Sequence, residues 1–316
     1  MDARAARPAD EHTDALAVRL SDPGEIAASI PQLLGFRPRE SVVLISLRGP
    51  TGRRVGLTVR GDLPPAGKEA AAARLLSRSV RSDRPRGVVL AVITETSADR
   101  ASDGEARDRG SAPRSGGDLP HRALVHEFVQ ALAAVDVPVV DALLVRAGRW
   151  WSYDCRRPCC SPGVGTPLPA RVTELEVAAV VSGTVVERDR ADLGARIARP
   201  RDRGARRGMA EACATVAEET AARLVAGGSG EVAAESWAGV EAALVRCRPG
   251  GPVAGGPLSD REVARIVWGL RNVGVRDRAL MLALGPDAAA VEQLWAECTR
   301  RAPAPLDAAP ATLLAV

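Results

Sequence analysis

The chain has 316 residues, of which 46% are hydrophobic and 26% are charged, and its formal net charge is +4. This length and composition allow two domains with buried cores and argue against a wholly disordered chain. No apolar run approaches the roughly 18 residues that a transmembrane helix needs, and residues 1–14 lack the apolar stretch of a secretory signal. We therefore expect a cytoplasmic protein with no membrane association.

Residues 15–169 are predicted to form a mixed α/β domain in the order helix, strand, strand, helix, strand, helix, strand, strand. Its first helix has Asp22 as N-cap and is expected to end near Ile30. Strands are expected where short apolar or alternating runs lie between turn residues, at 42–47, 55–59, 88–93, 139–145 and 149–153. The run at 88–93 is apolar throughout, which is typical of a central strand covered on both faces. Two more helices are predicted, at 69–80 and 124–132.

Two polar stretches and a change of hydrophobic period mark the limits of the domains. Residues 1–14 are predicted to be a disordered tail and residues 96–118 a flexible insertion. From 170 to 316, apolar residues recur at helical spacing, which predicts an all-helical C-terminal domain. Three cysteines lie on the apolar faces of these helices and are expected to be core residues, namely Cys213, Cys247 and Cys298.

The basic residues exclude one class of enzyme and disfavour one class of partner. Lys68 is the only lysine among 43 basic residues, and Glu69 follows it where a Walker-type phosphate loop needs Ser or Thr. Walker-type nucleotide hydrolysis is therefore excluded. The arginine-rich segment 199–207 lacks the interleaved aromatic residues that stack on bases. We expect a protein partner rather than a nucleic acid.

Cys155, Cys159 and Cys160 form the most unusual group of side chains in the sequence, and three interpretations of it stay open. The first is a metal site, with zinc as the ion. Zinc prefers four tetrahedral ligands, so the cysteines would need a partner such as His121 or His126. These two histidines lie about 140° apart on a helix and do not share a face.

The second interpretation is a redox or nucleophilic thiol, whose pKa the positive charges of Arg156 and Arg157 would lower. The third, which the sequence favours, is a rigid turn with incidental thiols. Adjacent side chains point apart in an extended chain, so Cys159 and Cys160 are not expected to face the same ion. We therefore expect substoichiometric metal in the purified protein.

Several uncommon motifs occur in order along the chain: Ile30–Pro38, Ser41–Val43, Arg60–Pro64, Arg149–Cys155, Cys159–Cys160 and Thr166–Pro169. In these motifs the chain resembles an actinobacterial family of domains of unknown function, numbered four-one-nine-two, from about Val18 to its last residue. The resemblance implies a bacterial cytoplasmic protein and brings no activity, cofactor or catalytic residue. Members of this kind continue with further helical sequence, so the resemblance also implies a C-terminal truncation here.

From these signals we expect a non-catalytic binding or regulatory module. The alternative is a cysteine-centred enzyme or a metal-binding protein that uses Cys155, Cys159 and Cys160. Convergence of the thiols with a histidine or an acid in space would distinguish the two. The binding surface near the cysteines is expected to comprise Gly35, Phe36, Arg37, Trp150, Trp151 and Tyr153.

Overall fold

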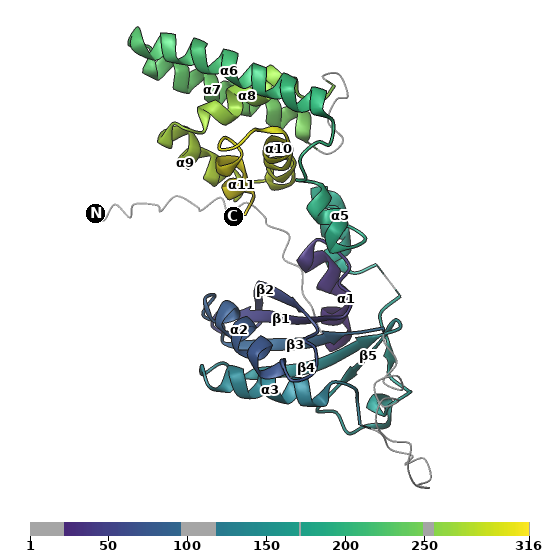
Figure 1. The fold of residues 1–316 in the computed structure, drawn as a ribbon. Helices are drawn as coiled ribbons and strands as arrows, with labels where there is room; N and C mark the ends of the chain where they lie inside the picture. The colour runs from purple at the N-terminus through teal and green to yellow at the C-terminus, as the bar shows by residue number, and fades with distance from the viewer. Residues whose placement is uncertain (1–21, 96–117, 171, 249–255, 316) are drawn as a thin grey trace, which may run out of the picture. The chain divides into compact units, whose positions relative to one another are not determined.

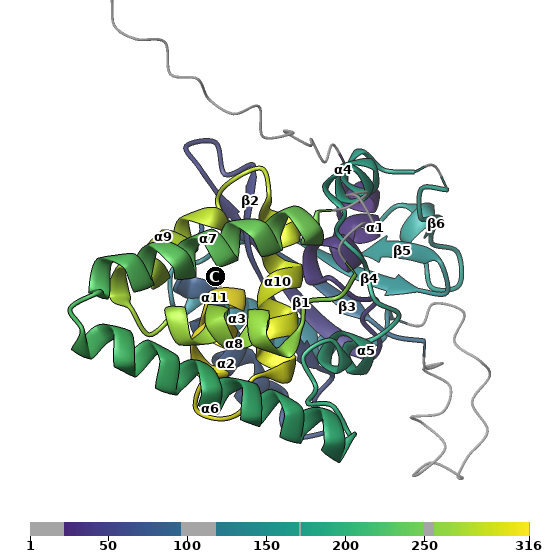
Figure 2. The ribbon, with the colours of Figure 1, turned by 90° about the horizontal axis from the view of Figure 1, so that it is seen from above.

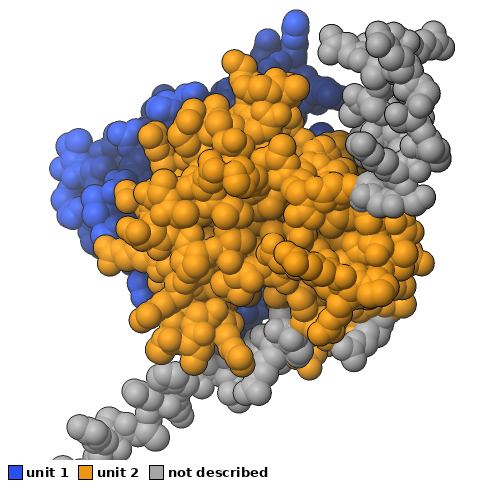
Figure 3. Space-filling model, turned by 90° about the horizontal axis from the view of Figure 1, so that it is seen from below, with its two compact units in different colours: residues 1–17, 178–185, 191–316 blue, residues 18–177, 186–190 orange. Residues whose placement is uncertain are grey.

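The computed structural model describes residues 22–95, 118–170, 172–248 and 256–315. The predicted tail 1–14 and residues 96–117 of the predicted insertion lie outside these described residues. The chain divides into two compact units (Figure 3). We call residues 18–177 with 186–190 the α/β unit. The helical unit contains, among the described residues, 178–185 and 191–315.

The α/β unit contains one mixed sheet in the strand order β2–β1–β3–β4–β5–β6 (Figure 1). Its strands are β1 (Ser41–Arg48), β2 (Arg54–Asp62), β3 (Gly87–Ile93), β4 (Val139–Arg146), β5 (Arg149–Ser152) and β6 (Thr166–Pro167). Only β3 and β4 are parallel, and the other neighbours are antiparallel. The mixed sheet is confirmed. The two-residue strand β6 was not predicted.

Three helices cover the sheet, α1 (Pro23–Leu34), α2 (Glu69–Arg81) and α3 (Arg122–Ala133). Side chains of the central strands alternate between two cores. Leu44 and Leu90 pack in the core that includes α2 and α3, whereas Val43 and Val89 pack in the core that includes α1. Every residue of β3 is buried. Burial on both faces explains why this strand is apolar without alternation.

Helix α1 continues beyond Ile30, where the sequence predicts its end, and runs through Pro31 to Leu34. A proline inside a helix removes one backbone hydrogen bond. The apolar face of α1 offsets this loss, because Ile30 is buried and Leu33 and Leu34 pack against the same core. The helix ends at Gly35, whose φ of 73° is the left-handed conformation that glycine adopts without strain.

Beyond Pro167, the described residues contain helices and one isolated β-bridge between Glu187 and Phe36, and no further strand. The helices are α4 (Glu174–Ser182), α5 (Arg190–Ala195), α6 (Arg203–Val225), α7 (Ser229–Cys247), α8 (Asp260–Gly269), α9 (Val273–Leu282), α10 (Ala288–Arg301) and α11 (Ala308–Leu314). Ser259 and Glu262 form the predicted capping box of α8. None of the described helices combines the length and apolar composition needed to span a bilayer.

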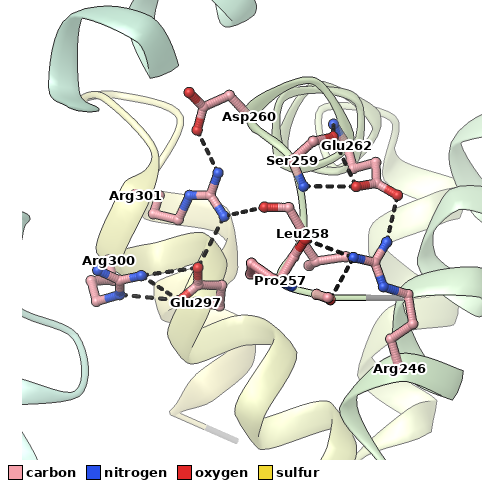
Figure 4. Close-up of polar contacts among 10 residues, drawn as sticks. Arg246, Pro257, Leu258, Ser259, Asp260, Glu262, Glu297, Arg300 and Arg301 are labelled. Atoms are coloured by element: carbon pink, nitrogen blue, oxygen red, sulfur yellow. Dashed lines mark hydrogen bonds and ion pairs between the residues drawn. The ribbon is translucent and has the colours of Figure 1, made fainter. Parts of the chain in front are cut away.

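Two arginines fix the segment that enters α8 (Figure 4). Arg246 of α7 pairs with Glu262 at 2.6 Å and donates to the carbonyls of Gly256 and Pro257. Arg301 of α10 donates to the carbonyl of Leu258 at 2.6 Å and forms ion pairs with residues of α8 and α10, namely Asp260 and Glu297. These contacts tie three helices together through one loop.

Replacing Arg301 with alanine should cost about 2 kcal/mol, because its side chain is only 13% exposed and its loss leaves the carbonyl of the buried Leu258 and two partly buried carboxylates without this donor. Arg300 is the matched control, since it is 33% exposed and pairs within its own helix with Glu297. Arg300→Ala should cost below about 1 kcal/mol. The measurement is the urea midpoint of the helical circular dichroism signal. Equal shifts for the two variants would contradict this account of the loop.

Cys213 and Cys298 are buried in the helical core and Cys247 is partly buried against it, as the sequence predicts. Cys298 is 0% exposed beside Leu294 and Trp295. Cys298→Ser should destabilise the protein by about 1–3 kcal/mol, because a hydroxyl is costly to bury without a partner. Cys298→Ala should cost less. Equal melting temperatures for the wild type and the serine variant would rule out this burial penalty.

Candidate functional site

Cys155, Cys159 and Cys160 converge in space. Their three sulfur atoms all lie within 4.8 Å of one another. Cys160 is buried, Cys155 is half-buried and Cys159 is exposed. The group therefore lies at the surface, open to solvent on one side and supported by the core on the other. We call residues 155–162, which follow β5, the cysteine loop.

Two consecutive turns bring the sulfur atoms together. The amide of Cys155 donates to the carbonyl of Ser152 at 3.3 Å. Pro158 then opens a short 3₁₀ helix, η2 (Pro158–Cys160), in which the amide of Cys160 donates to the carbonyl of Arg157 at 2.9 Å. The backbone at the two adjacent cysteines is thus bent. The expectation that their side chains point apart rested on an extended chain, and it was wrong.

The end of β5 anchors the cysteine loop to the core of the α/β unit. The amide of Ser152 donates to the sulfur of Cys160 at 3.4 Å. The indole of Trp151 donates to the carbonyl of Ser161 at 3.2 Å, and the hydroxyl of Tyr153 donates to the carbonyl of Pro120 at 2.6 Å. The side chains of Trp151, Tyr153 and Cys160 belong to one buried cluster. These contacts fix the position of the loop against the core.

Three of the six residues of the predicted binding surface have buried side chains, whereas Arg37 is exposed. Phe36, Trp151 and Tyr153 are only 7%, 6% and 4% exposed. Trp150 is partly buried in the core on the other face of the sheet from Trp151, as alternation along β5 requires. Large aromatic side chains gain most when they are removed from water, and here they serve as core residues.

The two remaining residues of that predicted surface, Gly35 and Arg37, pair with the chain itself. The carbonyl of Gly35 accepts from the amide of Glu187 at 2.8 Å, and the amide of Arg37 donates to the carbonyl of Glu187 at 3.1 Å. Of the six predicted residues, Trp151 and Tyr153 share a buried cluster with Cys160. They support the site and do not form its surface.

Positive charge surrounds the thiols. A cavity of about 190 Å³ adjoins them and is lined by Asp118, Leu119, Arg122, Cys155, Arg156, Arg157, Cys160, Ser161 and Pro162. Arg122 comes from the start of α3, pairs with Asp118 and donates to the carbonyl of Tyr153 at 3.2 Å. Sequence reasoning missed Arg122, because the residue is distant along the chain and only the fold brings it to the loop.

Two of the thiols differ in acidity. Hydrogen bonding from the backbone amide of Arg157, and then from the thiol of Cys160, lowers the pKa of Cys155, and the charge of Arg157 acts in the same direction. Burial raises the pKa of Cys160 to about 11. The site therefore contains one thiol that ionises readily beside one that resists ionisation.

Neither histidine joins the thiols. His121 lies at the N-cap of α3 with a left-handed φ of 61°, and His126 is exposed on α3 with a 2.7 Å hydrogen bond to Gln130. Among the residues that the structure describes, no histidine, aspartate or glutamate adds a ligand atom to the three sulfur atoms. The donor set contributed by this part of the chain is three thiols.

The sequence profile of the family DUF4192, described as a domain of unknown function, matches residues 23–316. No curated protein and no solved structure matches the chain. The profile covers the described residues of both units almost completely. The family resemblance carried by the sequence motifs is confirmed.

At about pH 8, iodoacetamide should modify Cys155 before Cys160, because only the thiolate is nucleophilic. Lowering the pH reprotonates each thiol as it passes through its pKa. The modification rate of Cys155 should therefore fall to half its maximum at a lower pH than that of an ordinary thiol, and that of Cys160 near pH 11. Peptide mass spectrometry over a pH series measures both rates. Coincident profiles would contradict the assignment.

Proposed function

Because the chain belongs to the DUF4192 family, whose description assigns no activity, we propose a function from the geometry of the cysteine loop. The protein is a non-catalytic binding module that holds one thiophilic metal ion on Cys155, Cys159 and Cys160. Zinc is the first candidate for the ion. The observation that carries the proposal is the convergence of three sulfur atoms within 4.8 Å.

The sulfur separations suit a thiolate-bound ion. A Zn–S bond of about 2.3 Å in tetrahedral geometry requires sulfur atoms about 3.8 Å apart. Small side-chain rotations reach this spacing from separations within 4.8 Å. Three thiolates and Zn²⁺ have a net charge of −1, and Arg156 and Arg157 line the adjacent cavity with compensating positive charge, whereas Arg122 there is paired with Asp118. The lowered pKa of Cys155 favours the deprotonated form that a metal needs.

The fourth coordination position distinguishes this site from a closed structural zinc site. With three ligands from the described residues, the ion would retain a position for water or for a group from another molecule. A protein partner that supplies the fourth ligand would bind through the metal. Binding through the metal needs no catalytic acid or base, which agrees with a non-catalytic binding module.

Thiol–disulfide exchange is the second candidate, and the difference in pKa between Cys155 and Cys160 favours it. In that reaction the Cys155 thiolate attacks a disulfide of another molecule and expels one of its sulfurs as a thiolate. Cys160, after losing its proton, then attacks the mixed disulfide. The second substrate thiolate leaves and a Cys155–Cys160 disulfide remains. The substrate disulfide gains the two electrons that the two cysteines lose.

Two wider expectations belong to the same proposal. The cytoplasm is the compartment, because its thiol buffers keep groups of neighbouring cysteines reduced and able to bind metal. The helical unit acts as a separate domain that begins later than the predicted boundary at 170, supported by its own buried core of side chains from α6 to α11.

Protein produced with added zinc and purified without chelator should carry one zinc ion per chain, measured by elemental analysis. Cys155→Ala and Cys160→Ala should lose the ion, because two thiolates alone bind zinc weakly. Cys298→Ala, which removes a core thiol from the helical unit, is the matched control and should retain it. Cobalt substitution should add a thiolate charge-transfer band that disappears in the same two variants.

The competing functions predict different results. Metal-free protein that forms a reversible Cys155–Cys160 disulfide would replace the metal proposal with thiol exchange. Metal-free protein whose thiols neither pair nor react selectively would leave the cysteine loop a structural turn. Zinc retained in both Cys155→Ala and Cys160→Ala would place the ion elsewhere in the chain.

A further inference from the structure

The helical unit contains a hollow of about 680 Å³ between α6 and α7, lined on one side by α8. Figure 2 shows these two helices joined at one end, with α8 lying between them. Pockets that bind small organic molecules have volumes of about 300–1,000 Å³ and mostly apolar walls with a few placed polar groups. The hollow has this size. It lies within one unit and shares no residue with the cysteine loop.

The walls of the hollow are mostly small or apolar. Side chains that line it recur at helical spacing on α6 and α7, including Val216, Leu224, Val232, Ala242 and Ala243. On α7, the opposite face carries Trp237, Val240 and Leu244 into the helical core. The face towards the hollow thus has no large side chain to fill it. Leu224, which is 49% exposed, adds an apolar side chain to this wall.

The acidic residues that line the hollow all have arginine partners. Glu235 pairs with Arg223 through two hydrogen bonds of 2.5 and 2.9 Å, which join α7 to α6. Glu219 pairs with Arg261 at 2.5 Å. The third, Glu262, pairs with Arg246. These carboxylates are neutralised within the protein.

Two arginines in the lining have no such partner. Among the described residues, no carboxylate lies within ion-pair distance of Arg265 or Arg271. Arg265 acts on Glu235 only at longer range, and Arg271 lies over the ring of Trp268 at 4.8 Å. The hollow therefore combines apolar walls with two positive charges that are not neutralised by neighbouring acids.

We propose that this hollow binds an organic anion with an apolar body. The body occupies the space between α6 and α7, and the carboxylate, sulfonate or phosphate of the ligand pairs with Arg265 and Arg271. Arginine suits this role, because its planar group forms paired hydrogen bonds with such anions and also stacks on an aromatic ring, as Arg271 does on Trp268. This site is independent of the metal proposed on the cysteine loop.

The test uses a pair of fluorescent probes that differ in one group. 8-Anilinonaphthalene-1-sulfonate supplies an apolar body with an anionic group, and N-phenyl-1-naphthylamine is the same body without the sulfonate. The 316-residue chain should bind one sulfonate probe per chain with a dissociation constant at least about tenfold below that of the neutral probe.

Three variants locate the binding. The double variant Arg265→Ala/Arg271→Ala should weaken sulfonate binding about tenfold and leave the neutral probe unchanged. Arg207→Ala, at an exposed arginine near the start of α6 outside the hollow, is the charge control and should change neither. Ala242→Trp fills the hollow and should reduce binding of both probes. Circular dichroism confirms that each variant is folded.

Equal affinity of the two probes, with no effect of the double variant, would overturn the proposal and leave only an apolar surface. Absence of saturable binding by either probe would overturn it as well. Loss of sulfonate binding in Arg207→Ala to the same extent as in the double variant would also overturn it, because the effect would then follow net charge and not the hollow. Metal content plays no part in these outcomes.

Discussion

Burial of β1 and β3 on both faces is the constraint on which the α/β unit depends. Every residue of β3 is buried, and the side chains of β1 alternate between the two cores. Two apolar faces need helices on both sides, which α1 on one side and α2 with α3 on the other provide. Towards the β5 edge of the sheet, the helical layer formed by α2 and α3 is replaced by a loop. At β5, the last strand longer than two residues, Trp151 and Tyr153 extend the core and support a loop instead of a helix.

This support determines what the cysteine loop can do. Where the metal ion itself orders its ligands, as in zinc fingers, the entropy that the ligands lose reduces the free energy of metal binding. Here the amide of Ser152 donates to the sulfur of Cys160, and the indole of Trp151 donates to the carbonyl of Ser161. Part of the ordering cost is therefore met by the fold itself. Two thiols with opposite pKa shifts then lie in one rigid turn, a combination that serves metal capture and thiol exchange alike.

The sequence predicts the sheet well because strand periodicity is a local signal, and the runs at 42–47, 88–93 and 139–145 coincide with β1, β3 and β4. The site was harder to predict. The bend at Cys159 and Cys160 depends on hydrogen bonds of the 3₁₀ turn, and side-chain alternation in an extended strand gives the opposite answer. Aromatic residues near a motif suggest a binding surface, whereas their burial depends on tertiary packing.

Arginine is abundant throughout this chain, and the role of each arginine depends on its ion-pair partners. Net charge treats every arginine alike, yet Arg301 is a structural residue that joins α8 and α10, and Arg199 of the basic segment 199–207 pairs with Asp307. Arg265 and Arg271 differ, because the acids beside them are already neutralised by other arginines. An unneutralised charge next to apolar walls favours a ligand that satisfies both. The distribution of ion pairs, and not the composition, therefore singles out the hollow of the helical unit.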